Sequence, residues 1–211
     1  MNKELCPLCG GKSSEYFKGK TKSYFLCSNC KGIFVEKKYL PDRNTELSRY
    51  NLHNNNIADV GYQNFVSPIV NEILANHNSK EIGLDFGAGN SSVISKTLQD
   101  KGFTIRQYDP FFHNFPELLQ QQYDYIVCCE VIEHFHNPAQ EFALLNKLLR
   151  KNGKLYCMTN IYNEAIDFSK WWYKNDLTHV FFYQVETLNY IRENFNFSNL
   201  YIQGNLIVLS A

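Results

Sequence analysis

A glycine-rich turn between two apolar runs constrains the fold of this 211-residue chain more than any other feature. Residues 82–86 (IGLDF) have the length and apolar character of a buried strand, and Gly87 and Gly89 follow at once. Residues 91–101 have apolar side chains at helical spacing, and residues 103–108 form a second strand-like run. This order is a βαβ unit, so we predict the nucleotide-binding half of a doubly wound fold.

Two aspartates flank the turn and narrow the class of ligand. Asp85 lies two residues before Gly87, where its charge would repel the pyrophosphate of a dinucleotide and suit the amino group and sulfonium of S-adenosylmethionine. Asp109 lies twenty residues after Gly89, where a carboxylate can accept hydrogen bonds from both ribose hydroxyls. The third glycine of the dinucleotide fingerprint is replaced by Ser92. The alternative is that both aspartates are ordinary caps of strand ends.

The rest of the chain continues the alternation of strands and helices. Asn137, followed by Gln140, predicts a capped helix that ends at Gly153. The fold class is therefore α/β: a doubly wound, Rossmann-like and mostly parallel sheet with an antiparallel C-terminal hairpin strand. The other expected elements are helix 64–77, strand 123–130, strand 154–159, helix 185–195, and the hairpin strands 199–203 and 206–210.

Four of the seven cysteines form two CxxC pairs near the start of the chain, Cys6 with Cys9 and Cys27 with Cys30. Two such turns can supply the four thiolates that structural zinc binds at about 2.3 Å in a tetrahedron. Short strand-like runs between the pairs complete the pattern of a small zinc ribbon. A thioredoxin-like redox pair is the alternative. It is disfavoured because the segment lacks a βαβ context and has too few apolar residues to fold without metal.

Composition and cysteine usage indicate a cytoplasmic protein. Its 21 basic residues balance 21 acidic ones, which argues against broad nucleic-acid binding. We find no signal peptide and no apolar run long enough for a membrane span. Cys128, Cys129 and Cys157 are expected to be core residues in a reducing compartment.

The expected organisation has three parts, with an asparagine-rich connector in the middle. They are a zinc ribbon at residues 1–40, a polar linker at residues 41–63 that includes His53 and Asn54–Asn56, and the α/β domain at residues 64–211.

Three segments carry a resemblance to a known family: LDFGAGNSS at the glycine-rich turn, YDP at Asp109, and DYIVCCEVIEHF after the next strand. Over roughly residues 60–211 the chain resembles the class I S-adenosylmethionine-dependent methyltransferases. Two departures stand out. The third family glycine is Ser91, and the short stretch between Asp109 and Tyr123 predicts an abbreviated third strand.

The resemblance implies a set of cofactor-binding residues. They are Asp85, Gly87 and Gly89 for the methionine portion, Asp109 for the ribose, and Glu130 beside the methyl-transfer site.

Two histidines are candidate catalytic bases, because an imidazole with a pKa of about 6.5 can take a proton at neutral pH. His134 follows the strand at residues 123–130, and His179 lies in an aromatic segment with Trp172 and Phe182. The alternatives stay open here: His134 could be a surface residue beside Glu133, and the aromatic side chains could fill core.

We therefore expect methyl transfer from S-adenosylmethionine to a small-molecule acceptor, with zinc in a structural role and nucleic acid as an unlikely partner. One alternative is a ribbon that binds RNA or protein on a non-catalytic methyltransferase fold. Another is an NAD-dependent oxidoreductase, which the charge of Asp85 disfavours. The acceptor atom, the adenine contact and the oligomeric state are left unassigned.

Overall fold

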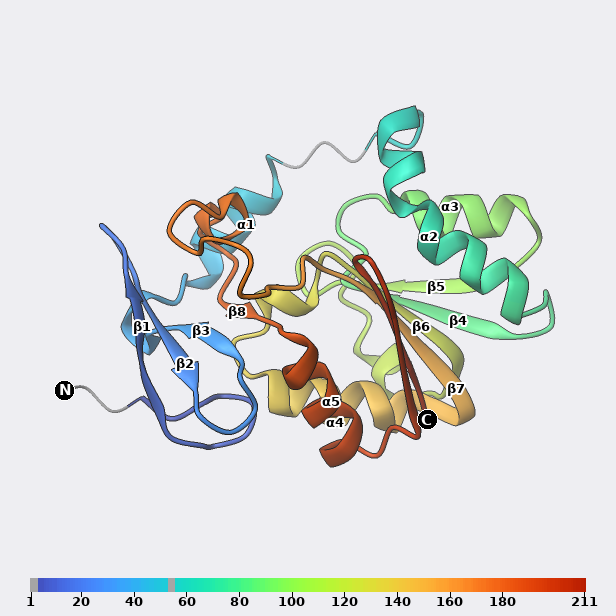
Figure 1. Cartoon of the computed structure of the whole chain (residues 1–211). Coiled ribbons are helices and arrows are strands. Elements are labelled where there is room, and N and C mark those ends of the chain that lie inside the picture. The colour runs from blue at the N-terminus through green and yellow to red at the C-terminus, as the bar shows by residue number, and fades with distance from the viewer. Residues whose placement is uncertain (1–3, 53–55) are drawn as a thin grey trace.

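The computed structural model describes residues 4–52 and 56–211 and contains two sheets (Figure 1). His53, Asn54 and Asn55 of the expected linker lie outside the described residues. The larger sheet has the strand order β5-β4-β6-β7-β10-β9. Its strands are β4 (Ile82–Phe86), β5 (Thr104–Tyr108), β6 (Tyr123–Cys129), β7 (Leu149–Met158), β9 (Asn199–Gln203) and β10 (Leu206–Ser210).

The pairing within this sheet confirms the predicted fold class. Strand β4 runs parallel to β5 and β6, and β6 runs parallel to β7. Strand β10 runs antiparallel to β7 and β9, so the C-terminal hairpin closes one edge. The order turns back beside β4, and at such a switch point ligands bind outside the carboxyl ends of the strands.

Helices cover both faces of the larger sheet (Figure 1). Alternate residues of β6 point to opposite faces: Val127 packs with two helices and Ile126 with the other two. Among the described residues no helix is long and apolar enough to cross a bilayer. The helices are α2 (Val60–Asn76) and α3 (Val93–Asp100) on one face, and α4 (Pro138–Leu148) and α5 (Val185–Asn194) on the other.

The expected linker contains more regular structure than its composition predicted. Helix α1 (Arg43–Tyr50) lies within it, and the Asp42 side chain caps this helix by accepting from Thr45 N at 2.8 Å. Helix α2 begins at Val60 rather than at residue 64, because Asp59 caps it in the same way. Side-chain capping thus organises a segment that we took for a connector.

Helix α4 also differs from the expectation. It begins at Pro138, but the Asn137 side chain makes no capping hydrogen bond in this part of the structure. It ends at Leu148, and Gly153 lies inside β7, which starts earlier than predicted. The short stretch before β6 forms the 3-10 helix η2 (Pro116–Gln120) in place of a full third strand, as its length indicated.

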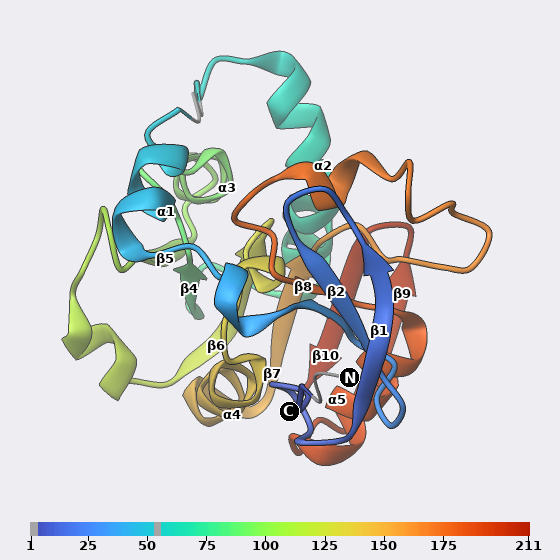
Figure 2. The same ribbon diagram turned by 90° about the vertical axis from the view of Figure 1, so that its left-hand side faces the viewer.

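The smaller sheet joins the N-terminal ribbon to a strand from the second half of the chain (Figure 2). Its order is β1-β2-β3-β8, and neighbouring strands are antiparallel. Three strands come from the ribbon and the fourth comes from beyond β7, so the ribbon sheet is completed by the α/β half. The strands are β1 (Ser13–Lys18), β2 (Ser23–Cys27), β3 (Ile33–Val35) and β8 (Phe181–Phe182).

Candidate functional site

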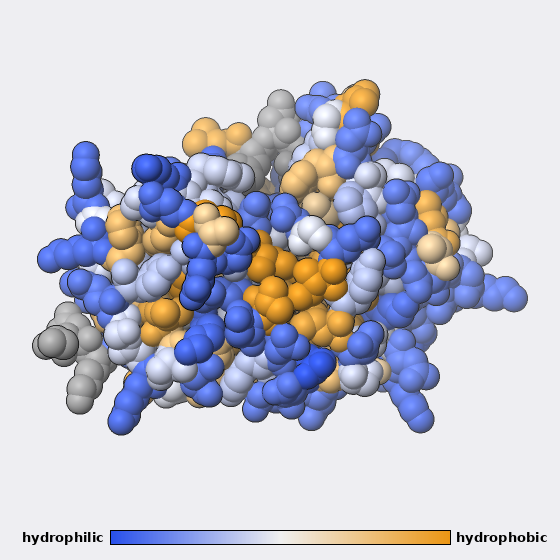
Figure 3. Space-filling view, in the orientation of Figure 1, coloured by the Kyte–Doolittle hydropathy of each residue, from blue (hydrophilic) through white to orange (hydrophobic). Residues whose placement is uncertain are grey.

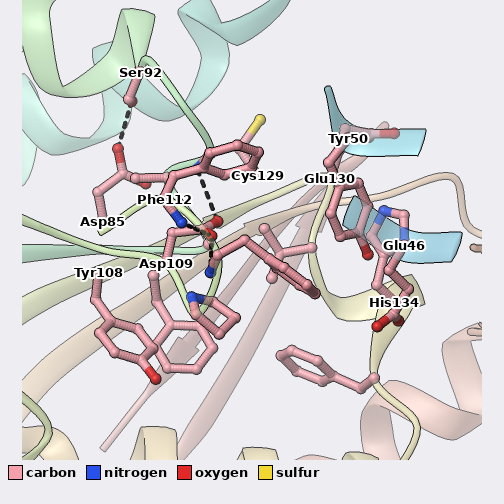
Figure 4. A pocket seen from close by; sticks show the side chains of 18 of the residues that line it. Glu46, Tyr50, Asp85, Ser92, Tyr108, Asp109, Phe112, Cys129, Glu130 and His134 are labelled. Atoms are coloured by element: carbon pink, nitrogen blue, oxygen red, sulfur yellow. Dashed lines mark hydrogen bonds between the residues drawn. The ribbon is translucent and has the colours of Figure 1, made fainter. Parts of the chain in front are cut away.

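A cavity of about 800 Å³ opens at the carboxyl ends of β4, β5 and β6 (Figure 4). Asp85 and Asp109 lie on one side of it, and Glu130 and His134 on the other. The structure brings together every cofactor-binding and catalytic candidate from the sequence. The candidates that line the cavity are Asp85, Gly87, Gly89, Asp109, Glu130, His134 and His179.

The glycine-rich turn, which we name the cradle, packs closely against Val131. Gly87 has φ +80°, and a Cβ built there would lie 2.6 Å from a methyl carbon of Val131. Gly89 has φ 64° and donates its N–H to Asp109 Oδ2 at 3.0 Å. Asp109 Oδ1 accepts from the amides of Phe111 and Phe112 at 2.8 and 3.1 Å. The carboxylate therefore ties the two loops of the cofactor side together.

Asp85 anchors the start of α3 beneath this turn. It is 3% exposed, and its Oδ2 accepts from the hydroxyls of Ser92 and Ser95 at 2.5 and 2.7 Å. Burial raises the pKa of the Asp85 carboxyl, although both hydroxyl donors oppose the shift. Ser92, which replaces the dinucleotide glycine, also caps α3 by accepting from Ser95 N at 3.1 Å.

Opposite the cradle lie four ionisable residues that we name the carboxylate–histidine cluster: Glu130, Glu133, His134 and His179. Glu130 has φ 52°, a backbone conformation rare for a non-glycine residue and concentrated at functional sites. The Tyr173 hydroxyl lies 2.5 Å from Glu133 Oε1 and 3.0 Å from Glu130 Oε2. One phenol thus bridges two carboxyl groups.

Burial favours the neutral, protonated form of both carboxyls. Glu133 is fully buried, and burial followed by the charge of Glu130 raises its pKa well above the usual value. Burial raises the pKa of Glu130 to about 7. Within the described part of the chain, Glu130 Oε1 and Glu133 Oε2 have no hydrogen-bond partner. Buried oxygens without a partner call for an explanation, and Glu130 lines the cavity, where a ligand could supply the missing partner.

Backbone carbonyls fix the tautomers of both histidines. His134 Nδ1 lies 2.9 Å from Thr178 O, and His179 Nδ1 lies 2.8 Å from Tyr173 O. Because a carbonyl only accepts, Nδ1 carries the proton in each ring and the lone pair is on Nε2. The His179 Nε2 lies 3.9 Å from Glu133 Oε1, and burial lowers the pKa of His179 to about 4. Its ring is therefore neutral at pH 7 and able to accept a proton.

The same donors could hold a cation. One ligand atom each of Glu133, His134 and His179 lies within 4.8 Å of the others. Carboxylate and imidazole donors suit several divalent ions, and the carbonyl behind each ring is the partner that metal-bound histidines usually have.

Helix α1 supplies a third wall that the sequence did not reveal. Glu46 and Tyr50 line the cavity, and the Tyr50 ring meets that of His134 edge-on with centroids 5.5 Å apart. Arg49 pairs with Asp176 at 2.6 Å and so joins α1 to the His179 segment. We missed these residues because the linker composition concealed a helix, although Asp42 is a capping signal that could have revealed it.

The aromatic segment divides between two roles. Trp172 lines the cavity and is 67% exposed, whereas Phe182 is 1% exposed and packs in the core shared with the ribbon. Of the three other cysteines, Cys128 and Cys157 are buried as expected, and Cys129 lines the cavity.

The four ribbon cysteines converge as the CxxC spacing indicated. The Sγ atoms of Cys6 and Cys30 lie 3.5 Å apart, those of Cys9 and Cys27 lie 3.3 Å apart, and all four lie within 4.8 Å of one another. A tetrahedron with bonds of about 2.3 Å has edges of about 3.8 Å, so this donor set fits a zinc ion with small adjustments.

We expect the purified protein to contain about one zinc ion per chain. Cys27→Ser should lower this to below about half an equivalent and reduce the thermal midpoint, because three thiolates hold zinc less tightly. Elemental analysis and a melting curve check both effects. Cys128→Ser, in the core of the larger sheet, is the matched control and should retain zinc. A wild-type protein with little zinc would contradict the prediction.

Residues 59–202 match a family model described as a methyltransferase domain. Two curated relatives are ubiquinone biosynthesis O-methyltransferases. The one from Sodalis glossinidius is 26% identical over 108 residues, which is 51% of this chain and 42% of the relative. The one from Pseudomonas syringae is 22% identical over 111 residues, which is 53% of this chain and 47% of the relative. The alignments thus span less than half of each relative.

Two solved structures share the fold. A SAM-dependent methyltransferase from Archaeoglobus fulgidus superposes with a TM-score of 0.53 at 14% identity, covering 71% of this chain and 94% of its own. An O-methyltransferase family protein from Burkholderia thailandensis also gives 0.53, at 10% identity, covering 78% of this chain and 61% of its own. At such identities these similarities concern architecture alone.

Proposed function

The chain belongs to the class I methyltransferase family, and from this premise we propose that it transfers a methyl group from S-adenosylmethionine to a small hydroxyl-bearing acceptor. The observation that carries the proposal is one continuous cavity with a cofactor cradle on one side and three members of the carboxylate–histidine cluster, Glu130, His134 and His179, on the other. The match to O-methyltransferases that act in ubiquinone biosynthesis supports a hydroxyl as the acceptor group.

The cradle fits the cofactor in shape and charge. The glycine-rich turn places the backbone of Gly87 and Gly89 at the cavity wall, and Asp109 presents a carboxylate to ribose hydroxyls. Asp85 adds negative potential beneath the place where an amino group would lie. The cofactor, when bound, supplies an activated methyl group on a sulfonium, so the protein mainly has to position the acceptor and exclude water.

The chain's own residues can manage the acceptor proton. In the proposed reaction the acceptor oxygen forms a bond to the methyl carbon, the carbon–sulfur bond breaks, and the hydroxyl proton leaves the oxygen. His179 Nε2 is the proposed recipient, because its ring is neutral and carries its lone pair on this atom. Glu133 Oε1 lies 3.9 Å from it, and the ionised form of this carboxyl would stabilise the imidazolium. His134, whose ring centroid is 4.8 Å from that of His179, is the second candidate base.

Isothermal titration tests the first step directly. We expect S-adenosylmethionine to bind with a dissociation constant between about 1 μM and 1 mM. A parallel fluorescence titration with NADH should show no saturable binding, because the Asp85 carboxylate disfavours pyrophosphate. The absence of S-adenosylmethionine binding, or saturable binding of NADH, would overturn the proposal.

The rival function, a ribbon that recruits RNA or protein on an inactive fold, is less well supported. Strand β8 completes the ribbon sheet, which ties the ribbon to the catalytic half, and the net charge is zero. The proposal also includes the division into a ribbon (1–40), a polar linker (41–63) and a methyltransferase domain (64–211). It further includes a structural zinc ion and a cytoplasmic location.

A further inference from the structure

The ribbon reaches the candidate site through one pair of strands. Ile33 of β3 pairs with Phe182 of β8, and Phe34 pairs with Phe181. One residue further on, Val35 N donates to Val180 O at 2.9 Å. We propose that the ribbon is a positioning element of the methyltransferase site, which holds residues 173–182, named here the acceptor wall, against the carboxylate–histidine cluster.

The acceptor wall makes the hydrogen bonds that orient the cluster. Val180 N donates to Glu133 O at 2.9 Å, so the backbone that Val35 holds from the ribbon side also holds Glu133. His134 Nδ1 donates to Thr178 O, and His179 belongs to the wall itself. Three of the four cluster residues therefore take their positions from a segment that ends in β8, the edge strand of the ribbon sheet.

Apolar packing makes this connection rigid. Tyr24, Ile33 and Val35 of the ribbon share one buried cluster with Trp171 and with Tyr173, Val180 and Phe182 of the wall. Apolar side chains also gather at the surface in the middle of the molecule, between the ribbon and the larger sheet (Figure 3). A close-packed core transmits displacement, so a shift of β3 moves the wall with it.

Polar contacts also join the ribbon to the acceptor wall at a second place. The Tyr24 hydroxyl donates to Lys174 O at 3.2 Å, and Lys22 Nζ donates to Leu177 O at 2.8 Å. These bonds restrain the wall along its length, because they lie upstream of the strand pairing. Pairing of β8 with β3 alone would restrain only the last residues of the acceptor wall.

The second cysteine pair adjoins this contact. Cys27 N donates to Gly32 O at 3.0 Å, which closes the turn that carries Cys30. Gly32 then faces the ring of Phe181, since a Cβ built on it would lie 2.4 Å from Phe181 Cζ. The shape of the cysteine turn, which a bound zinc ion would fix, therefore sets how closely β8 can approach.

Gly32→Ala tests the proposal, because the added methyl group must push β8 away from the ribbon without touching the cavity. Gly10→Ala is the control in the other cysteine turn. Its φ of +67° makes alanine strained there, but the added Cβ meets nothing within 4 Å and does not push on β8. Ring nitrogen resonances of ¹⁵N-labelled His134 and His179 report on the cluster. Tryptophan fluorescence emission reports on the segment directly before the acceptor wall, because Trp171 and Trp172 are the two tryptophans of the chain.

In Gly32→Ala we expect both histidine rings to shift and tryptophan emission to change, while the dissociation constant of S-adenosylhomocysteine stays within about twofold of wild type. Gly10→Ala should leave the ring resonances in place. Unshifted rings in folded Gly32→Ala protein would overturn the proposal, as would equal shifts in both variants.

If Gly32→Ala does not fold, zinc extraction from the wild-type protein replaces it. Ring resonances that move in step with zinc release support the proposal, and resonances that stay fixed after complete release overturn it. The proposal rests on the proposed function only in calling the cluster part of a methyltransferase site. Failure of wild-type protein to bind S-adenosylhomocysteine would refute that function and leave the histidine comparison valid.

Discussion

Replacing Asp109 with alanine is expected to raise the dissociation constant of S-adenosylhomocysteine by about 100-fold. A hydrogen bond from a ribose hydroxyl to a carboxylate contributes up to about 3 kcal/mol, and about 1.4 kcal/mol corresponds to tenfold in affinity. Asp109 also holds the amides of Gly89, Phe111 and Phe112, so its loss loosens the cradle as well.

Titration calorimetry measures this effect, and two further variants interpret it. Asp109→Asn keeps one acceptor oxygen and should give an intermediate loss. Asp100→Ala removes an exposed aspartate at the end of α3 that pairs with Lys96, and it should bind like wild type. Binding by Asp109→Ala within about threefold of wild type would show that this carboxylate does not contact the ribose.

Local signals predicted the larger sheet well. The bounds of β9 and β10 match the expected hairpin, because two strand-like runs with apolar residues flank the Gly204-Asn205 turn. The βαβ unit around Gly87 could also be predicted from the sequence, because the spacing of apolar residues changes from that of a strand to that of a helix at the turn. These elements depend on contacts within a few residues or on strong periodicity, and both are visible in a sequence.

The features that sequence reasoning missed depend on distant contacts. Strand β8 has two residues, too few for any period, and it exists because Phe181 and Phe182 find β3. The bridging of Glu130 and Glu133 by Tyr173 also joins segments about forty residues apart. The positive φ of Glu130 could not be predicted from its residue type, because glycine is the residue usually found in that conformation.

The cluster gives a second large expected effect: Glu133→Gln should reduce methyl transfer by about 10²–10⁴-fold, the usual contribution of general acid–base catalysis. Glutamine keeps the shape of the side chain but cannot ionise, so it cannot provide the carboxylate that would stabilise a charged His179. The affinity for S-adenosylmethionine should remain close to that of wild type, because Glu133 lies on the acceptor side. Initial rates with the best acceptor from a panel of phenols, together with calorimetry, separate the two effects.

The same substitution should change how stability depends on pH, in a direction that a merely damaged protein would not show. A carboxyl whose folded-state pKa is raised binds its proton more tightly when folded. Its stabilising contribution is therefore complete below the ordinary pKa and is lost as pH rises through the folded value. Glu133 has such a raised pKa, and the pKa of its neighbour Glu130 is about 7. Wild-type protein should thus melt at lower temperature at pH 8 than at pH 5.5, and Glu133→Gln should show a smaller decrease.

Asp124→Asn is the matched control for this pair of measurements. Asp124 lies at the opposite end of β6, where its carboxylate accepts from Ile82 N and from Arg150. Its loss should lower the melting temperature while leaving turnover near wild type, because it is remote from the cavity. A Glu133→Gln protein that resembles this control, less stable at every pH but still active, would show that Glu133 is structural. Higher stability than wild type at pH 8, together with lost turnover, is what we expect of a titratable carboxyl kept buried for catalysis.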